Sequence, residues 1–231
     1  MSKFSLPSVC LSLLALATPL CASAQFQGDV VLTPKGCEST GQCTLKNKLR
    51  FTDATGSVWE AKAGLVTDGA SIPGVFQPFV GSPFDQGFIK AAIVHDHYCD
   101  RHVRTWRETH RVFYEGLTAA GVSVARAKTM YFAVVLGGPK WIELIPGKNC
   151  GKNCVNNIKS TSGKPGLLTR KADYSAKDIA PALATLAAEL EANPLSQTLD
   201  QIDQRAKAVR PTDFYLINGS QYKVDNPDTF Q

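Results

Sequence analysis

The sequence predicts an α+β fold: a small N-terminal β segment packed on a three-helix core, with a helical C-terminal extension. Short runs of alternating apolar residues, separated by Pro, Gly and Asp, fill residues 26–73 and predict strands. Apolar residues with the helical period fill residues 83–139. A second stretch with that period covers residues 175–209 and supplies the extension.

Residues 1–24 have the three parts of a cleavable secretory signal peptide. Lys3 supplies a positive charge, an apolar run covers Val9–Ala17, and the small-residue site Ala22-Ser23-Ala24 precedes Gln25. The apolar run is shorter than the roughly 20 residues of a membrane-spanning helix, and no later run is long and apolar enough. We therefore expect a periplasmic or secreted protein with no membrane span. An uncleaved anchor is the alternative.

Charge and cysteine content restrict the partners and the compartment. The formal net charge is +5 without a dense run of Lys and Arg, so no nucleic-acid partner is expected. Cys37 and Cys43 lie close together in sequence, as do Cys150 and Cys154. In an oxidising compartment each pair can form a local disulfide, and zinc binding by all four is the alternative. Cys99 is left over.

The β segment ends in a turn-like stretch that can contribute to a site. The expected strands lie within Val30–Leu32, Leu45–Phe51 and Val58–Val66. The small, polar segment Thr67–Pro73 follows them. Gly69 and Ala70 let its backbone approach another element closely, so Asp68 and Ser71 lie on a natural rim or floor for a site.

The first helix of the core is expected to run from Asp85 to Arg104. Projected at about 100° per residue, it has one apolar and one polar side. Residues with polar or metal-ligating groups also fall on the apolar side: His95, Asp96, Cys99 and His102. His97 falls on the polar side and should face water.

The second helix also points a histidine inward. It begins at a capping-box spacing, Thr105 to Glu108, and ends before Gly121. His110 lies on its apolar side. The short connection makes the two helices antiparallel neighbours, so the inward residues of both can meet in one pocket. A third helix should cover Ser123–Leu136.

The C-terminal part combines a loop with two helices. Residues 147–170 are rich in Gly, Lys, Asn and Ser and predict a loop, and the helices within 175–209 are broken near Asn193. Residues 214–231 add a strand or a tail. We expect three units along the chain: the signal peptide 1–24, an α+β domain over 25–146, and the loop and helical extension 147–231.

Two chemical interpretations of the inward polar residues follow. The first is hydrolysis, with His95 as a general base and Asp68 or Asp96 orienting it. Ser71 as a nucleophile is a variant, and His110 completes the candidate site. The second is a metal site, whose candidate ligands are His95, Cys99, His102 and His110. Zinc accepts such mixtures of ligands.

Several motifs resemble the family called domain of unknown function 1353, whose members occur in bacteria and phages. They are Thr67–Pro73, Ala91–Asp96, Gly121-Val122 and Met130-Tyr131. The resemblance covers about residues 28–140 and implies no established activity. Where that family tends to have Asp on the second helix, this sequence has His110. The pair His95-Asp96 is also similar to the catalytic pair of secreted phospholipases A2, an analogy in chemistry that would imply calcium.

Two function classes therefore stay open. In the first, the protein is an exported hydrolase acting on an envelope or extracellular substrate. In the second, His95 and Asp96 are structural, and the protein is a non-catalytic exported module that binds an envelope polymer or another protein.

Overall fold

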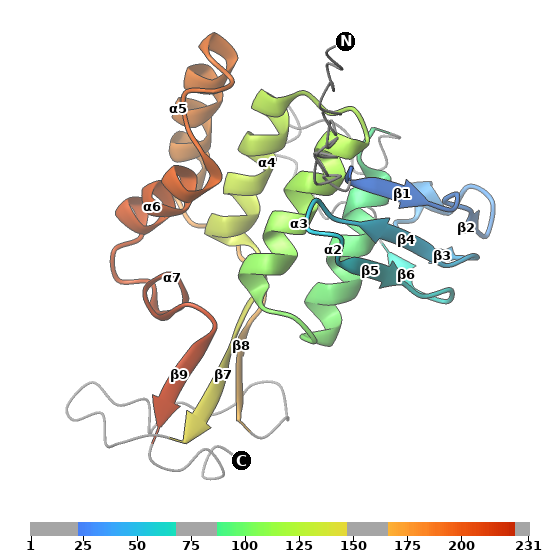
Figure 1. The fold of residues 1–231 in the computed structure, drawn as a ribbon, viewed down its shortest axis with the longest axis horizontal. Helices are drawn as coiled ribbons and strands as arrows, with labels where there is room; N and C mark the ends of the chain where they lie inside the picture. The colour runs from blue at the N-terminus through green and yellow to red at the C-terminus, as the bar shows by residue number, and fades with distance from the viewer. Residues whose placement is uncertain (1–22, 68–86, 147–165, 225–231) are drawn as a thin grey trace, which may run out of the picture.

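The computed structural model describes residues 23–67, 87–146 and 166–224, and it confirms the α+β fold class. Short strands come first along the chain, helices form the centre, and further helices and a sheet follow (Figure 1). Among the residues that the structure describes, no helix is both long and apolar enough to cross a membrane.

The N-terminal strands form two antiparallel sheets. One sheet has the order β1 (Gln25–Gln27), β4 (Leu49–Thr52) and β5 (Val58–Ala61). The other has the order β2 (Leu32–Thr33), β3 (Cys43–Leu45) and β6 (Val66–Thr67). Alternation along β4 sends Leu49 and Phe51 into the core, while Arg50 pairs across the sheet with Glu60 at 3.0 Å. The predicted strands are thus confirmed as shorter pieces.

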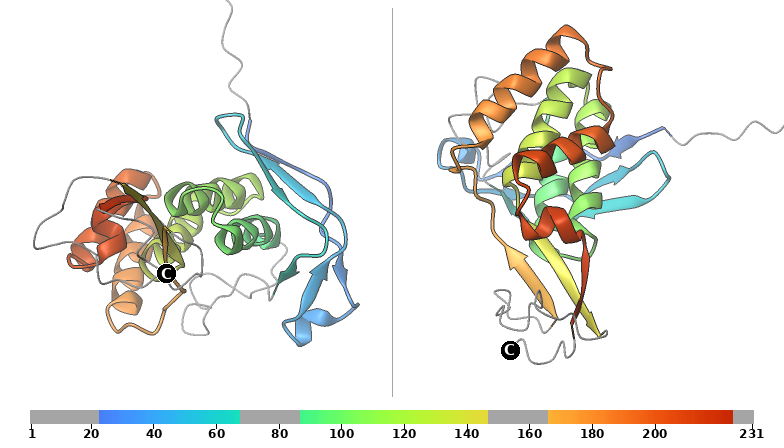
Figure 2. Two further views of the ribbon diagram at one scale, coloured as in Figure 1. Left: turned by 90° about the horizontal axis from the view of Figure 1, so that it is seen from below. Right: turned by 90° about the vertical axis from the view of Figure 1, so that its left-hand side faces the viewer.

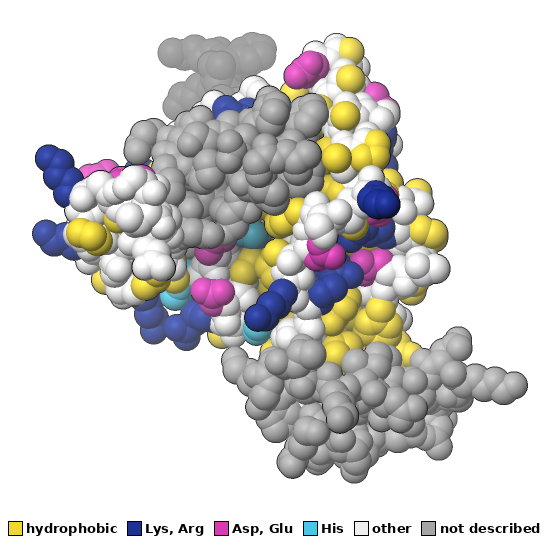
Figure 3. Space-filling model, turned by 180° about the vertical axis from the view of Figure 1, so that it is seen from behind, with side chains coloured by type: hydrophobic (Ala, Val, Ile, Leu, Met, Phe, Trp, Pro, Cys, Tyr) yellow, Lys and Arg dark blue, Asp and Glu magenta, His cyan; other side chains and the backbone are white. Residues whose placement is uncertain are grey.

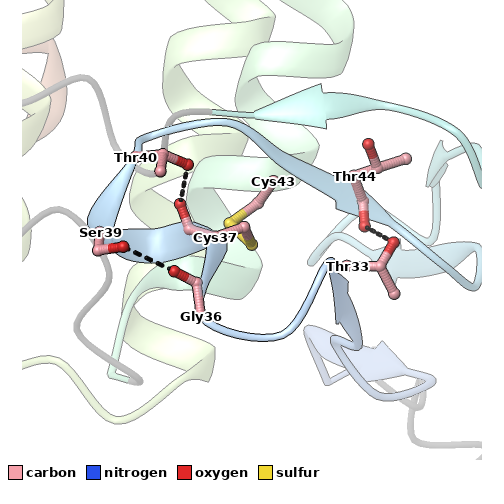
Figure 4. The surroundings of a disulfide bond; sticks show 7 residues. All are labelled: Thr33, Gly36, Cys37, Ser39, Thr40, Cys43 and Thr44. Carbon is pink, nitrogen blue, oxygen red and sulfur yellow. Dashed lines mark hydrogen bonds between the residues drawn. A yellow bond between two sulfur atoms is a disulfide. The ribbon is translucent and has the colours of Figure 1, made fainter.

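The predicted disulfide between Cys37 and Cys43 is confirmed (Figure 4). Cys37 begins a single 3-10 turn, Cys37–Ser39, and Cys43 begins β3. The Thr40 hydroxyl donates to the Cys37 carbonyl at 2.8 Å, which closes the turn. The bond therefore ties this turn to the sheet. The second predicted pair, Cys150 and Cys154, lies outside the described residues.

The core helices are α2 (Ile89–Arg101), α3 (Trp106–Ala119) and α4 (Val124–Gly137). The capping box at Thr105 and the end of α3 before Gly121 are confirmed. Gly116 lets α3 approach α2 closely, because a Cβ on it would meet the Ala91 Cβ at 3.0 Å. The first helix is shorter than predicted: it stops at Arg101, since His102 adopts the left-handed conformation with φ 53°.

Helix α2 is covered on two sides, and this overturns the prediction that His97 faces water. On one side it packs on α3 and on the residues of the main helical core. On the other, Ile89, Ile93 and Tyr98 pack against the N-terminal strands, which lie beside the helices in a separate layer (Figure 2). His97 is only 6% exposed. A helical projection that assumes one solvent-exposed side gives the wrong exposure for a helix buried between two layers.

The C-terminal part contains two predicted helices and a three-stranded sheet, of which the sequence indicated only the strand within residues 214–231. The helices α5 (Ile179–Ala192) and α6 (Leu199–Val209) confirm the predicted break. The short helix α7 (Phe214–Asn218) follows. In the sheet, β7 (Lys140–Pro146) pairs antiparallel with β8 (Leu167–Arg170) and parallel with β9 (Gln221–Val224). The predicted loop is therefore wrong over β8.

Buried polar contacts attach this C-terminal part to the core helices. Asp203 of α6 accepts a hydrogen bond from the Tyr131 hydroxyl of α4 at 2.6 Å and from Arg111 of α3 at 2.9 Å. Burial and the Asp203 carboxylate raise the pKa of Tyr131 well above its usual value. On the back of the molecule, charged side chains of both signs are interspersed among the described residues (Figure 3).

Replacing the N-cap residue of α3 tests how much the cap stabilises the folded protein. Thr105→Ala removes the acceptor of the Glu108 backbone N–H, so we expect the free energy of unfolding to fall by about 1 kcal/mol. Urea unfolding measures it. Thr185→Ala is the control, because that hydroxyl only donates to a carbonyl within α5. Equal losses in both variants would contradict the capping assignment.

Candidate functional site

The candidate site is built on the facing sides of α2 and α3. His95 is 6% exposed and its ring centroid lies 4.8 Å from that of Phe113 on α3. His110 is fully buried, with its ring centroid 5.6 Å from Trp106. As predicted, inward-facing residues of α2 and α3 lie next to each other.

A continuous line of polar atoms joins three of the predicted residues. His95 Nδ1 lies 3.4 Å from Asp96 Oδ1, and His95 Nε2 lies 2.9 Å from His110 Nδ1. Because an ionised carboxylate only accepts, the arrangement favours a proton on His95 Nδ1. His95 Nε2 then either accepts from His110 Nδ1 or, in the imidazolium, donates to it. The line can therefore store or relay one proton.

The environment of His110 strongly disfavours its charged form. Burial chiefly, and then the nearby His95 and Lys140, hold the pKa of His110 well below its usual value, and the Pro139 carbonyl acts in the opposite direction. Within the described part of the chain, no hydrogen bond of ordinary geometry satisfies His110 Nε2. A buried polar atom without a hydrogen bond costs about 1–3 kcal/mol of stability, so a hydrogen-bond partner for Nε2 would stabilise the site.

Cys99 adds a sulfur to the same cluster. Its Sγ lies 3.5 Å from His95 Nε2 and 3.8 Å from His95 Nδ1. Burial and the charge of Asp96 raise the pKa of the Cys99 thiol well above its usual value. One ligand atom from each of His95, Cys99 and His110 can be chosen so that all lie within 4.8 Å of one another.

A cavity of about 360 Å³ adjoins the cluster. His95, Asp96 and Cys99 contribute to its wall, together with Thr67 and Tyr174. The Asp96 side chain is 25% exposed, whereas that of His95 is 7% exposed. Asp96 is therefore the more accessible end of the line of polar atoms.

The remaining predicted site residues lie elsewhere. Asp68 and Ser71 fall outside the described residues, although Thr67, just before them, lines the cavity. His102 is not brought to the cluster. Its ring centroid lies 4.7 Å from that of Trp141, in the wall of a separate cavity of about 1110 Å³. The left-handed backbone at His102 accounts for this difference from a continued helix.

Tyr174 and Lys140 lie near the site but were not predicted from the sequence. Tyr174 reaches the cavity because its ring packs closely on Gly137, where a Cβ would meet it at 2.3 Å. Lys140 is fully buried, and its Nζ donates to the Leu136 carbonyl at 3.3 Å and to the Gly138 carbonyl at 3.2 Å. The contact of Tyr174 with Gly137 and the burial of Lys140 depend on the tertiary fold, and only the two Gly residues before Pro139 indicated close packing here.

Comparison with known proteins places the chain in a family without an assigned activity. The family model described as "Protein of unknown function (DUF1353)" matches residues 43–134. The chain is 41% identical over 169 residues to "Uncharacterized protein y4iH" of Sinorhizobium fredii, which covers 72% of this chain and 71% of that protein. It therefore belongs to the DUF1353 family, as the motifs indicated. No solved structure matches it.

A second protein of the same organism, "Uncharacterized protein y4jT", is 30% identical over 188 residues. The match covers 80% of this chain and 55% of that protein, so this chain spans just over half of that relative. Neither description names a reaction.

The burial of Lys140 predicts an unusual pH dependence. Burial chiefly, and the charge of Arg170, hold the pKa of Lys140 well below its usual value, whereas the unfolded chain has a pKa of about 10.4. Between these values the unfolded chain binds more protons. The free energy of unfolding should therefore rise with pH in that window, by up to about 1.4 kcal/mol per pH unit.

Lys140→Met should remove this contribution, which denaturant titrations between about pH 8 and pH 10 measure. Lys171→Met replaces an exposed lysine and serves as the control. If the wild-type protein and Lys140→Met have parallel pH profiles, Lys140 does not titrate as proposed.

Proposed function

We propose that this protein is an exported hydrolase that acts on an envelope or extracellular substrate at the cavity beside α2. The observation that supports it most is the buried line from Asp96 through His95 to His110, whose carboxylate end reaches the cavity. Polar lines of this kind at a cavity wall are typical of groups that move protons.

The exposure of the residues favours Asp96 as the group that meets the substrate. Both ring nitrogens of His95 face a partner, and its side chain is 7% exposed. In the proposed step, the oxygen of a water molecule attacks the substrate while Asp96 accepts one of its protons, and that proton then passes to the leaving group. His95 Nδ1 forms a hydrogen bond with the Asp96 carboxylate, and His110 forms one with His95 Nε2. This arrangement exchanges the roles that the sequence suggested for His95 and Asp96.

Export is supported by the signal-peptide pattern of residues 1–24, by the position of β1 and by the disulfide. Strand β1 begins at Gln25, so cleavage after Ala24 leaves the whole strand in the mature chain. Its pairing with β4 would then hold the new N-terminus in the sheet. The disulfide between Cys37 and Cys43 fits an oxidising compartment.

The second candidate function is a non-catalytic exported binding protein. The burial of His95 and the two partners of its ring favour it, because a satisfied buried pair also serves to fix one packing of α2 on α3. In that case the cavity binds a ligand without changing it.

The Asp96→Asn variant tests the catalytic proposal. The amide keeps the shape of the carboxylate but cannot take a proton, so we expect hydrolysis to fall by about 10²- to 10⁴-fold. The assay compares peptidoglycan and phospholipid as substrates. His102→Asn is the control, since Asn tolerates its left-handed backbone and this residue lines the other cavity.

Full activity in a folded Asp96→Asn variant would contradict the role of Asp96. If the wild-type protein binds one of these substrates and releases no product, the binding function takes its place.

Export is tested by the mass and N-terminal sequence of the protein recovered from the periplasm or medium of a bacterial host. We expect the mature chain to begin at Gln25. Ala24→Arg should leave the precursor uncut, because a small residue is needed directly before the cleavage point. An intact N-terminus on wild-type protein in the cytoplasmic fraction would refute the proposal.

A further inference from the structure

We propose that His95, Cys99 and His110 bind a zinc ion beside the cavity, with one coordination position left for water or substrate. The inference deepens the proposed function by naming a cofactor for the same site. The catalytic role of the metal rests on the proposed function, whereas the binding of the metal rests on the cluster itself.

The three ligands project from rigid elements that already face each other. His95 and Cys99 are four residues apart and therefore lie on one face of α2. His110 comes from α3, and the close approach at Gly116 fixes the spacing of the two helices. Sites built on packed helices hold their geometry better than sites on loops.

The distances are close to those of a tetrahedral zinc site. With Zn–N bonds of about 2.0–2.1 Å and Zn–S bonds of about 2.3 Å, two nitrogens lie about 3.3 Å apart, and a nitrogen and a sulfur about 3.5 Å apart. The nitrogens of His95 and His110 are 2.9 Å apart, and Cys99 Sγ is 3.5 Å from His95 Nε2. The third pair, Cys99 and His110, has its ligand atoms within 4.8 Å, so binding the ion needs the two imidazoles to separate slightly and Cys99 Sγ to lie about 3.5 Å from both nitrogens.

The outer nitrogen of His95 is placed as a metal-binding histidine requires. A ligating histidine normally donates its other N–H to a carboxylate or a backbone carbonyl. When His95 binds through Nε2, its Nδ1 faces Asp96 at 3.4 Å. When His110 binds through Nδ1, its outer nitrogen is Nε2, which has no hydrogen bond of ordinary geometry within the described residues.

The candidate ligands are buried, and their atoms select the metal. His110 is 0% exposed. Cys99 is 8% exposed and forms no disulfide. Two nitrogens and a sulfur suit zinc, whereas calcium takes oxygen ligands, so the calcium suggested by the phospholipase analogy does not fit this donor set.

Bound zinc would polarise a water molecule or a substrate carbonyl at the cavity. Asp96 remains at the wall of the cavity as the carboxylate that holds His95 and accepts a proton. Without the metal, the same residues form a hydrogen-bonded histidine pair next to a neutral thiol. The two arrangements differ in metal content, which can be measured directly.

The experiment measures metal in the full chain purified without chelator, by elemental analysis, and then replaces it with Co²⁺. We expect one zinc per chain and, with cobalt, a thiolate-to-metal absorption band, because the Cys99 sulfur is a ligand. Cys99→Ala should remove the band, and both Cys99→Ala and His110→Ala should weaken zinc binding by more than about 100-fold. Loss of an outer partner alone costs about 10- to 100-fold.

His102→Asn is the matched control, because it replaces a histidine of the same segment that lies outside the cluster. It should bind zinc as the wild-type protein does. Circular dichroism checks that each variant folds. If Cys99→Ala or His110→Ala does not fold, the cobalt band of the wild-type protein decides the question.

The outcomes separate this inference from the proposed function. Folded wild-type protein that binds no zinc, or whose cobalt form lacks the thiolate band, overturns the zinc site. Hydrolysis that persists at full rate in metal-free protein overturns the use of zinc in the reaction and leaves the proposed function standing. Zinc binding that needs Cys99 and His110, in a protein without hydrolytic activity, supports the site and removes the proposed function.

Discussion

The burial of α2 between two layers is the constraint on which the rest of the structure depends. The N-terminal sheets cover one side of this helix and α3 covers the other. Every polar side chain that points into either layer must then find a partner or lose its hydration. His95, His97 and Cys99 all lie in such positions, and their chemistry is decided by what surrounds them rather than by solvent.

The same constraint gives the candidate site its properties. Packing on α3 brings His110 to His95, and burial lowers the pKa of His110 and raises that of the Cys99 thiol, which favours the uncharged form of both. Asp96 is at the edge of this buried zone, where it touches both His95 and the cavity. The proposals on hydrolysis and zinc therefore concern one physical unit.

Local signals in the sequence predicted those features that depend on neighbouring residues. The capping box at Thr105, the inward side of α3 with His110, and the disulfide between Cys37 and Cys43 are of this kind. The approach of His95 to His110 followed from two such helices joined by a short connection.

Features that depend on distant contacts could not be predicted in this way. His97 is buried, and a projection of α2 alone cannot show that a second layer covers it. His102 has a left-handed backbone although it is not glycine, so the end of the helix there was not predicted. Strand β8 has no alternation long enough to stand out, because both its existence and its register come from pairing with β7. Tyr174 reaches the cavity only through its packing on Gly137.

The position of β7 at the centre of the C-terminal sheet has a consequence for how the chain folds. Its parallel partner β9 lies near the end of the described chain, and Glu143 and Gln221, which face each other across the pair, are separated by 78 residues. Closing so long a loop is slow, so β7 has an open edge until the last part of the chain is available. A protein that crosses a membrane unfolded would complete this sheet only after Gln221–Val224 had followed. Until then, the exposed strand would need protection from pairing with other chains.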